Sequence, residues 1–184
     1  RGLAERLGGE ARSTPGAAFR NLREPVLDAL GPGPLERATF YAATVLKEGS
    51  QARSHAKQGG VTVIDRYWLS TLAYARARGA THLLAALEVL VPPPDITLFV
   101  TLDEHERQQR LFAREHCTAA DRETLDPTFR QAVFRHSFEG VGEAFRPVRL
   151  DVTGLDPIAC VEHARRTVYQ QLERSVRIRV SGLR

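Results

Sequence analysis

The sequence lacks any long hydrophobic run. No apolar stretch approaches the ~20 residues that a membrane-spanning helix requires, and the first residues have no apolar core of the kind found in signal peptides. These absences argue against an integral membrane protein and against an exported one. We therefore expect a cytoplasmic protein that does not insert into a membrane.

Cysteine is also scarce. The two cysteines, Cys117 and Cys160, stand far apart without CxxC or Cys/His spacing, which disfavours a disulfide framework and a zinc site. Charged residues at 26% and hydrophobic residues at 42% are typical of globular proteins, and no repeat or low-complexity tract occurs. We expect a single domain over residues 1–184 with reduced thiols.

Methionine is absent altogether, and the chain begins at Arg1. The opening stretch "RGLAERLGG" places Leu3 and Leu7 four residues apart before two glycines, a pattern typical of the last turns of a helix. We therefore expect that a segment preceding this helix end is missing from the sequence.

What the chain does contain is an alternation of short β-branched runs and helical patterns. "VTVI", "ITLFVTL" and "PVRLDVT" are typical of strands, and amphipathic stretches between and after them are typical of helices. This alternation predicts an α/β fold with three layers, α/β/α, around a parallel sheet. Such folds bind ligands at the carboxyl ends of their strands, where Asp65 and Arg66 follow "VTVI". By position alone, this pair suits a helix cap as well as a ligand site.

The stretch "VIDRYWLSTLAYA" resembles the "DRYxxSxxAY" signature of thymidylate kinases, a family of P-loop nucleoside monophosphate kinases. "PPPDITLFV", "RQQRLFARE...DR" and "LDVTGLDPIACVEHARRTV" resemble, in the same order, a later strand, the arginine-bearing lid and the final strand and helix of that family. The resemblance extends over nearly the whole chain and implies the same fold, with the lid at about 110–127 and a C-terminal tail at 175–184.

The resemblance implies roles for residues of the signature. Arg66 should hold the phosphate of the acceptor nucleotide, with Asp65 near a metal ion and the phosphates. Ser70 and Tyr74 belong to the same signature, and Tyr74 should line the acceptor pocket. Tyr41 matches the aromatic residue that stacks on the acceptor base, although its place in a helical stripe suits a core residue nearly as well.

The remaining site residues are arginines. Arg110 and Arg114 match the start of the lid and Arg122 lies in its loop, where their charge would stabilise a phosphoryl group in transfer. A solvated helix face is the alternative for these three. Arg12 and Arg23 lie near an acceptor-side turn whose alignment is ambiguous, and one or both are expected to contact the acceptor phosphate.

The sequence departs from the family pattern in three places. No GxxxxGK[ST] loop occurs, so the lysine and the backbone cradle for the donor phosphates are absent, and the central strand of the sheet would be absent with them. Val45 stands where an arginine that binds the acceptor phosphate is usual, and Ala75 replaces a frequent glutamine. These two changes put thymidylate itself in doubt.

The resulting hypothesis is a nucleotide kinase that transfers the γ-phosphoryl group of ATP to a nucleoside monophosphate such as dTMP, with Mg²⁺. We expect the chain as given to be inactive without its P-loop. The alternatives are a non-catalytic nucleotide-binding relative and a kinase with a different acceptor. The resemblance also implies a homodimer.

A nucleic-acid-binding module is a further alternative. The net charge of +4, the pI near 9.5 and the C-terminal "RSVRIRV" would suit it. However, aromatic residues do not alternate with the basic ones as stacking platforms would require. We therefore do not expect nucleic acid to be a partner.

Overall fold

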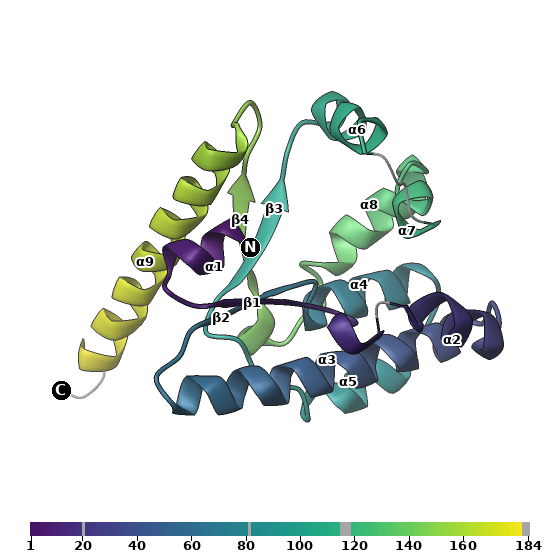
Figure 1. Cartoon of the computed structure of the whole chain (residues 1–184), viewed down its shortest axis with the longest axis horizontal. Coiled ribbons are helices and arrows are strands. Elements are labelled where there is room, and N and C mark those ends of the chain that lie inside the picture. The colour runs from purple at the N-terminus through teal and green to yellow at the C-terminus, as the bar shows by residue number, and fades with distance from the viewer. Residues whose placement is uncertain (20, 81, 115–118, 182–184) are drawn as a thin grey trace.

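The structure, a computed structural model, describes residues 1–19, 21–80, 82–114 and 119–181, and short strands alternate with helices along it (Figure 1). The strands are β1 (Glu10–Ser13), β2 (Thr62–Asp65), β3 (Thr97–Thr101) and β4 (Pro147–Asp151). The α-helices are α1 (Gly2–Arg6), α2 (Arg23–Leu30), α3 (Pro34–Lys57), α4 (Trp68–Ala77), α5 (His82–Glu88), α6 (Glu104–Phe112), α7 (Ala119–Glu123), α8 (Pro127–His136) and α9 (Pro157–Ser181). Short 3-10 helices lie at η1 (Ala17–Phe19) and η2 (Glu143–Phe145).

The strands form two parallel pairs. β1 pairs with β2 in a register that places Ser13 opposite Asp65, and β3 pairs with β4 with Thr101 opposite Asp151. Within the described ranges no strand joins β2 to β3, so the sheet is divided between them. The parallel pairing confirms the predicted α/β fold class, and the division matches the gap expected from the sequence.

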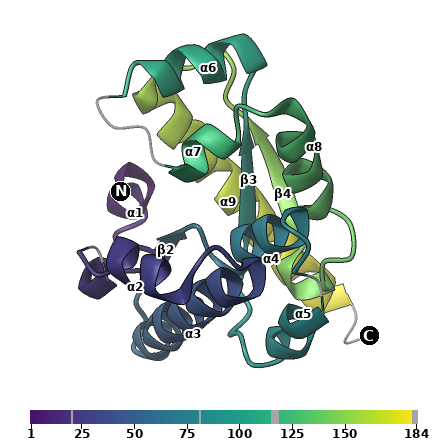
Figure 2. The same ribbon diagram turned by 90° about the vertical axis from the view of Figure 1, so that its right-hand side faces the viewer.

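Helices cover both sides of the strands (Figures 1 and 2). On one side, α9 and α1 pack against β3 and β4, where Leu150, Val152 and Ala164 are buried and Leu3 and Leu98 pack against them. On the other side lie α3, α4 and α8, and α4 contacts both of the other two. These are the three layers that the sequence predicts.

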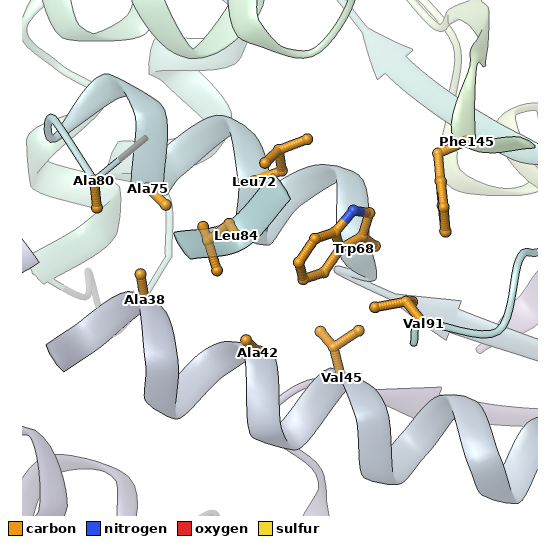
Figure 3. Close-up of a cluster of buried hydrophobic side chains, with 10 residues drawn as sticks. All are labelled: Ala38, Ala42, Val45, Trp68, Leu72, Ala75, Ala80, Leu84, Val91 and Phe145. Atoms are coloured by element: carbon orange, nitrogen blue, oxygen red, sulfur yellow. The ribbon is translucent and has the colours of Figure 1, made fainter. Parts of the chain in front are cut away.

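The larger hydrophobic cluster joins α3 to α4 (Figure 3). Trp68 is completely buried in it, and the indole Nε1 donates a 2.8 Å hydrogen bond to the Glu88 carboxylate. The other members are Ala38, Ala42, Val45, Leu72, Ala75, Ala80, Leu84, Val91 and Phe145. Because Trp68 begins α4, this cluster fixes the helix that directly follows Asp65 and Arg66.

Three elements have features that the sequence-based interpretation did not include. β1 was not predicted, because its four residues, "EARS", are mostly polar. α2 begins only at Arg23, so Pro25 lies in the first turn, where a missing backbone N–H leaves no helical bond unmade. α9 continues through Ser181, so the tail expected from residue 175 is helical up to that point.

Two other expectations concern cysteine and membranes. Among the described residues Cys160 is a free thiol, and Cys117 lies outside them, so the expectation of reduced thiols stays a prediction. In the part of the chain that the structure describes, no helix has the length and apolar character needed to cross a membrane.

Gly49 of α3 allows Tyr67 to pass close to the helix. A Cβ at Gly49 would collide with the Tyr67 hydroxyl and lie 3.2 Å from Pro92 Cδ. The Tyr67 hydroxyl donates a 2.8 Å hydrogen bond to the Pro92 carbonyl, and burial raises the pKa of Tyr67 to about 12. Since Tyr67 directly follows Arg66, Gly49 helps to set the position of the segment that carries Asp65 and Arg66.

Replacing Gly49 with alanine should therefore destabilise the protein. Overpacking of this kind costs ~1–3 kcal/mol, which exceeds the ~1 kcal/mol that alanine gains over glycine inside a helix. Denaturant unfolding measures the difference in the free energy of unfolding. Ser54→Ala, at an exposed position of the same helix, is the control and should change that free energy by less than about 0.5 kcal/mol. Equal stability of Gly49→Ala and the wild type would contradict the prediction.

Candidate functional site

The chain turns sharply at the carboxyl end of β2. Arg66 has a φ of 61°, in the left-handed region that residues other than glycine seldom adopt. Thr14, just after β1, holds this turn: its N–H donates a 3.1 Å hydrogen bond to the Asp65 carbonyl, and its hydroxyl donates one to the Arg66 carbonyl. Because the left-handed backbone costs ~1–2 kcal/mol, these contacts with Thr14 are needed to offset it.

The Arg66 side chain lies against Tyr74 of α4. Its Cζ is 5.7 Å from the centroid of the Tyr74 ring, a distance at which a guanidinium is attracted to an aromatic face. Although Arg66 as a whole is exposed, desolvation of the guanidinium lowers its pKa, but Tyr74, Asp65 and Asp121 outweigh this effect and raise the pKa above its ordinary value. The site therefore holds a permanent positive charge, carried by an exposed side chain that an anion from solvent can reach.

One face of α4 and its C-terminal cap carries Ser70, Tyr74 and Arg78 at a spacing of four residues. The Cζ atom of Arg78 is 5.4 Å from the Tyr74 centroid, so two guanidinium groups lie near this ring. Phe129 of α8 meets the ring edge to face at 6.0 Å. The predicted residues of the signature are thus gathered at the end of β2 and along one face of α4.

The three predicted lid arginines have different surroundings. Arg114 lies 3.5 Å from the Asp121 carboxylate. Arg110, in α6, donates a 2.8 Å hydrogen bond to the Leu155 carbonyl in the loop before α9. Arg122 is exposed on α7. The structure therefore pairs Arg114 with a carboxylate of the lid itself, while Arg110 faces the β4–α9 loop.

Asp121 lies in the lid segment. Its carboxylate pairs with Arg114 at 3.5 Å, and its negative charge is a minor contributor to the raised pKa of Arg66. The lid carboxylate thus partners Arg114 and adds negative charge to the surroundings of Arg66.

Tyr41 and Arg23 form a second group. Arg23 Nε donates a 3.0 Å hydrogen bond to the Tyr41 hydroxyl, and its Cζ is 5.8 Å from the centre of the Tyr41 ring. Arg23 is also 3.6 Å from Glu24. Tyr41 is only half-buried, so it is not the closed core residue that its helical stripe also suggested.

Arg12 has different partners. It pairs with Glu10 of its own strand, and its Nη1 lies 3.2 Å from the buried carboxylate of Glu48, which Lys47 also contacts at 2.9 Å. Arg12 also hydrogen-bonds Gln51. None of these partners is a predicted site residue, so Arg12 belongs to the contact between β1 and α3.

The two positions that depart from the family pattern lie in the hydrophobic core. Val45 is 0% exposed and Ala75 is 2% exposed, and both belong to the cluster between α3 and α4. Neither side chain offers a polar group to a ligand, so any acceptor contacts that an arginine and a glutamine make at these positions in the family are absent from this chain. The choice of acceptor therefore stays open.

Sequence reasoning missed three residues of this region. Thr14 had no signal beyond its place in a turn-rich stretch. Arg78 follows Tyr74 by four residues, and this helical spacing was the one signal that pointed to it. Asp121 precedes Arg122 in the lid, but its contacts across the lid have no counterpart in local sequence.

The parallel strands, the helical layers and the arginines beyond the end of β2 define an α/β fold of the nucleotide-kinase type. A family model described as thymidylate kinase matches residues 12–146, and the chain belongs to this family of nucleoside monophosphate kinases. A comparison with curated proteins finds no match.

A solved structure of thymidylate kinase from Candida albicans superposes on the chain with a TM-score of 0.65. The two sequences are 18% identical, and the match covers 94% of this chain and 85% of the other. At this identity the likeness concerns the fold, and it confirms the fold class predicted from the sequence.

Glu104, at the start of α6, should make the stability of the protein sensitive to acid. Hydrogen bonding by Arg107 lowers its pKa to about 2, helped by Gln108 and by the charge of Arg130. Since the ordinary pKa is 4.5, this stabilisation is present above pH 4.5 and is lost as the pH falls from there toward 2.

The melting temperature of the wild type should therefore fall more between about pH 6 and pH 3 than that of Glu104→Gln, which lacks the titrating group. Thermal unfolding followed by circular dichroism measures both. Glu143→Gln, at a carboxylate whose side chain is 79% exposed, serves as the control and should keep the pH dependence of the wild type. If the melting temperatures of Glu104→Gln and the wild type differ by the same amount at both pH values, the lowered pKa of Glu104 is contradicted.

Proposed function

We propose that the protein is the acceptor-binding part of a kinase that transfers the γ-phosphoryl group of ATP to a nucleoside monophosphate such as dTMP. The observation that carries this proposal is the contact of Arg66 with Tyr74 at the carboxyl end of β2. In an α/β fold of this type, ligands bind at that end of the strands. The membership of the family supports the reaction class.

The residues have distinct tasks in this proposal. Arg66 binds the acceptor phosphate through charge-assisted hydrogen bonds, and Tyr74 holds the guanidinium in place. Tyr41, oriented by Arg23, offers an aromatic face to the base. The lid arginines supply positive charge, which matters because phosphoryl transfer depends mainly on positioning and electrostatic stabilisation. They are Arg110, Arg114 and Arg122.

Mg²⁺ fits one carboxylate of this site. In the described residues no group of three or more potential ligands is found, which is consistent with an ion held mainly by nucleotide phosphates and water. Asp65, exposed at the end of β2, would hold it, directly or through water. The ion would neutralise charge on the phosphates when bound.

The sequence contains no GxxxxGK[ST] loop for the donor phosphates. We propose that these 184 residues bind the acceptor nucleotide but do not turn it over by themselves. A non-catalytic nucleotide-binding relative is the second candidate, and the same missing loop favours it. The two candidates predict different activities for the natural gene product: a kinase forms ADP from ATP, and a non-catalytic relative does not.

The first test measures binding and turnover separately. Isothermal titration of the chain with dTMP, dUMP, UMP, dCMP, AMP and GMP should show saturable binding of dTMP, without ADP formation when ATP and Mg²⁺ are added. The natural gene product should form ADP in the presence of dTMP. Binding of none of these nucleotides would overturn the acceptor site, and a gene product that binds dTMP but forms no ADP would favour the second candidate.

The same titration also determines which nucleoside monophosphates the site accepts. The thymidylate kinase from Candida albicans has broad substrate specificity. We propose a thymidylate-type acceptor here because Asp65, Arg66, Ser70 and Tyr74 resemble the family's signature residue by residue. A tighter affinity for another monophosphate in the panel would replace dTMP with that acceptor.

Arg66→Ala should weaken dTMP binding roughly tenfold to a hundredfold, because a hydrogen bond to a charged group contributes ~1.5–3 kcal/mol. Arg66→Gly should weaken it equally. The two variants should differ in folding, since glycine adopts the φ of 61° freely and alanine does not. The glycine variant should therefore be at least as stable to denaturant as the alanine variant. An unchanged Kd for dTMP in both variants would remove Arg66 from the site.

We further propose a homodimer in the cytoplasm, as the resemblance to the family implies. Leu22, Leu30 and Leu35 are exposed apolar residues on and around α2 and the start of α3, and they offer a surface for a second copy. Light scattering after size exclusion measures the mass directly. A monomer at micromolar concentration would contradict the dimer without affecting the proposed reaction.

A further inference from the structure

Arg78 stands at the end of α4 with its backbone firmly set. Gly79, with a φ of 90°, ends the helix. Ala80 N–H donates a 2.9 Å hydrogen bond to the Ala75 carbonyl, and Gly79 N–H donates one of 3.0 Å to the Arg76 carbonyl. This pair of bonds is the Schellman motif that closes many helices. The Arg78 side chain thus leaves the helix from a fixed position, one turn after Tyr74.

The guanidinium of Arg78 lies between three elements. Its Cζ is 5.4 Å from the Tyr74 centroid and 5.7 Å from that of Phe129 in α8, and its Nη2 pairs with the Glu123 carboxylate in α7. The side chain is only 17% exposed, and its Nε–H is buried without a hydrogen-bond acceptor among the described residues. A buried N–H that lacks an acceptor is costly, so stability alone does not explain this arrangement.

We propose that Arg78 is a positioning residue that couples the lid to the acceptor pocket. It packs against the same Tyr74 ring that Arg66 contacts, and it ties α7 to α4 through Glu123. This inference rests on the proposed function for the nucleotide, but the tie between α7 and α4 is independent of it.

The chemistry of arginine is what this position requires. Its planar guanidinium can stack on aromatic rings and pair with a carboxylate at the same time, whereas the ammonium group of lysine is a point charge without a stacking plane. A lysine in place of Arg78 would keep the charge but lose one of the two contacts. We therefore expect that a lysine at this position cannot perform the role of Arg78.

The lid segment contacts α4 through Glu123, which pairs with Arg78. Asp121, two residues earlier, adds a negative charge that contributes to the raised pKa of Arg66. Thr124, just beyond α7, accepts a 3.0 Å hydrogen bond at its carbonyl from Arg107 of α6. A nucleotide that fixes Tyr74 should therefore favour the ordered lid, and, because coupling between two sites is reciprocal, an ordered lid should raise the affinity for the nucleotide.

The first experiment needs no nucleotide. Hydrogen–deuterium exchange of residues 119–126 should be about tenfold faster in Arg78→Ala and in Glu123→Gln than in the wild type, because each removes the pair between Arg78 and Glu123. Exchange in α3 should not change. The double variant should exchange no faster than either single variant, because both remove the same contact. Unchanged exchange in both single variants, or fully additive effects, would overturn the tie between α7 and α4.

The second experiment measures the Kd for dTMP by titration. Arg78→Ala and Arg78→Lys should raise it about tenfold, and Glu123→Gln should raise it less, because Tyr74 keeps its stacking partner. Arg76→Ala is the matched control, since Arg76 lies on the same helix but donates 3.0 and 2.8 Å hydrogen bonds to the Glu139 and Gly140 carbonyls. Its Kd should equal that of the wild type.

The outcomes separate the two proposals. If Arg76→Ala weakens dTMP binding as much as Arg78→Ala, the effect is a general one of α4 packing and the positioning role is overturned. If the wild type binds no dTMP while the exchange results are as expected, the proposed function fails and the tie between α7 and α4 stands. Circular dichroism spectra of all variants show whether each remains folded, and Glu123→Gln, which changes a half-exposed side chain, keeps the test valid if Arg78→Ala does not fold.

Discussion

The candidate site depends on the backbone turn at Arg66. A left-handed conformation at the end of β2 sends the chain directly into α4 and leaves the Arg66 side chain beside Tyr74. Thr14 donates to the carbonyls of Asp65 and Arg66, so the loop after β1 and the end of β2 hold one another. Without the parallel pairing that brings Ser13 opposite Asp65, neither the turn nor the position of the guanidinium would be defined.

Charge balance explains how a cluster of arginines is tolerated without a bound anion. Arg66 has Asp65 and Asp121 near it, Arg114 pairs with Asp121, and Arg78 pairs with Glu123. Two of these three carboxylates belong to the lid. The lid segment thus supplies negative charge to Arg66 and Arg78, so that under the proposed function a phosphate would compete with lid carboxylates for these guanidinium groups.

The sequence carried enough information for the fold class, three of the four strands and the signature residues, because each of these is encoded in local pattern or in a short motif. "VIDRYWLSTLAYA" placed Asp65, Arg66, Ser70 and Tyr74 correctly on a strand end and a helix. β1 was not predicted, because a strand of four mostly polar residues has no alternation of hydrophobic and polar side chains. The pairing of Arg12 with Glu48 and that of Arg78 with Glu123 join residues 36 and 45 positions apart, which no local pattern reveals.

The hydrophobic clusters show how α4 is held in place although the sheet is divided. The first cluster, around Trp68 and Val45, joins α3 to α4 and does not involve β3 or β4 (Figure 3). The second cluster, around Leu150 and Val152, joins β4 to α9 and α1. The two halves are linked through α8, which contacts α4 and places Phe129 against Tyr74, while its Phe134 meets Phe99 of β3 at 5.6 Å. α4 and the turn at Arg66 are therefore held by α3 and α8, and α8 also joins them to the half of the structure that carries β3 and β4, although no strand pairs β2 with β3 among the described residues.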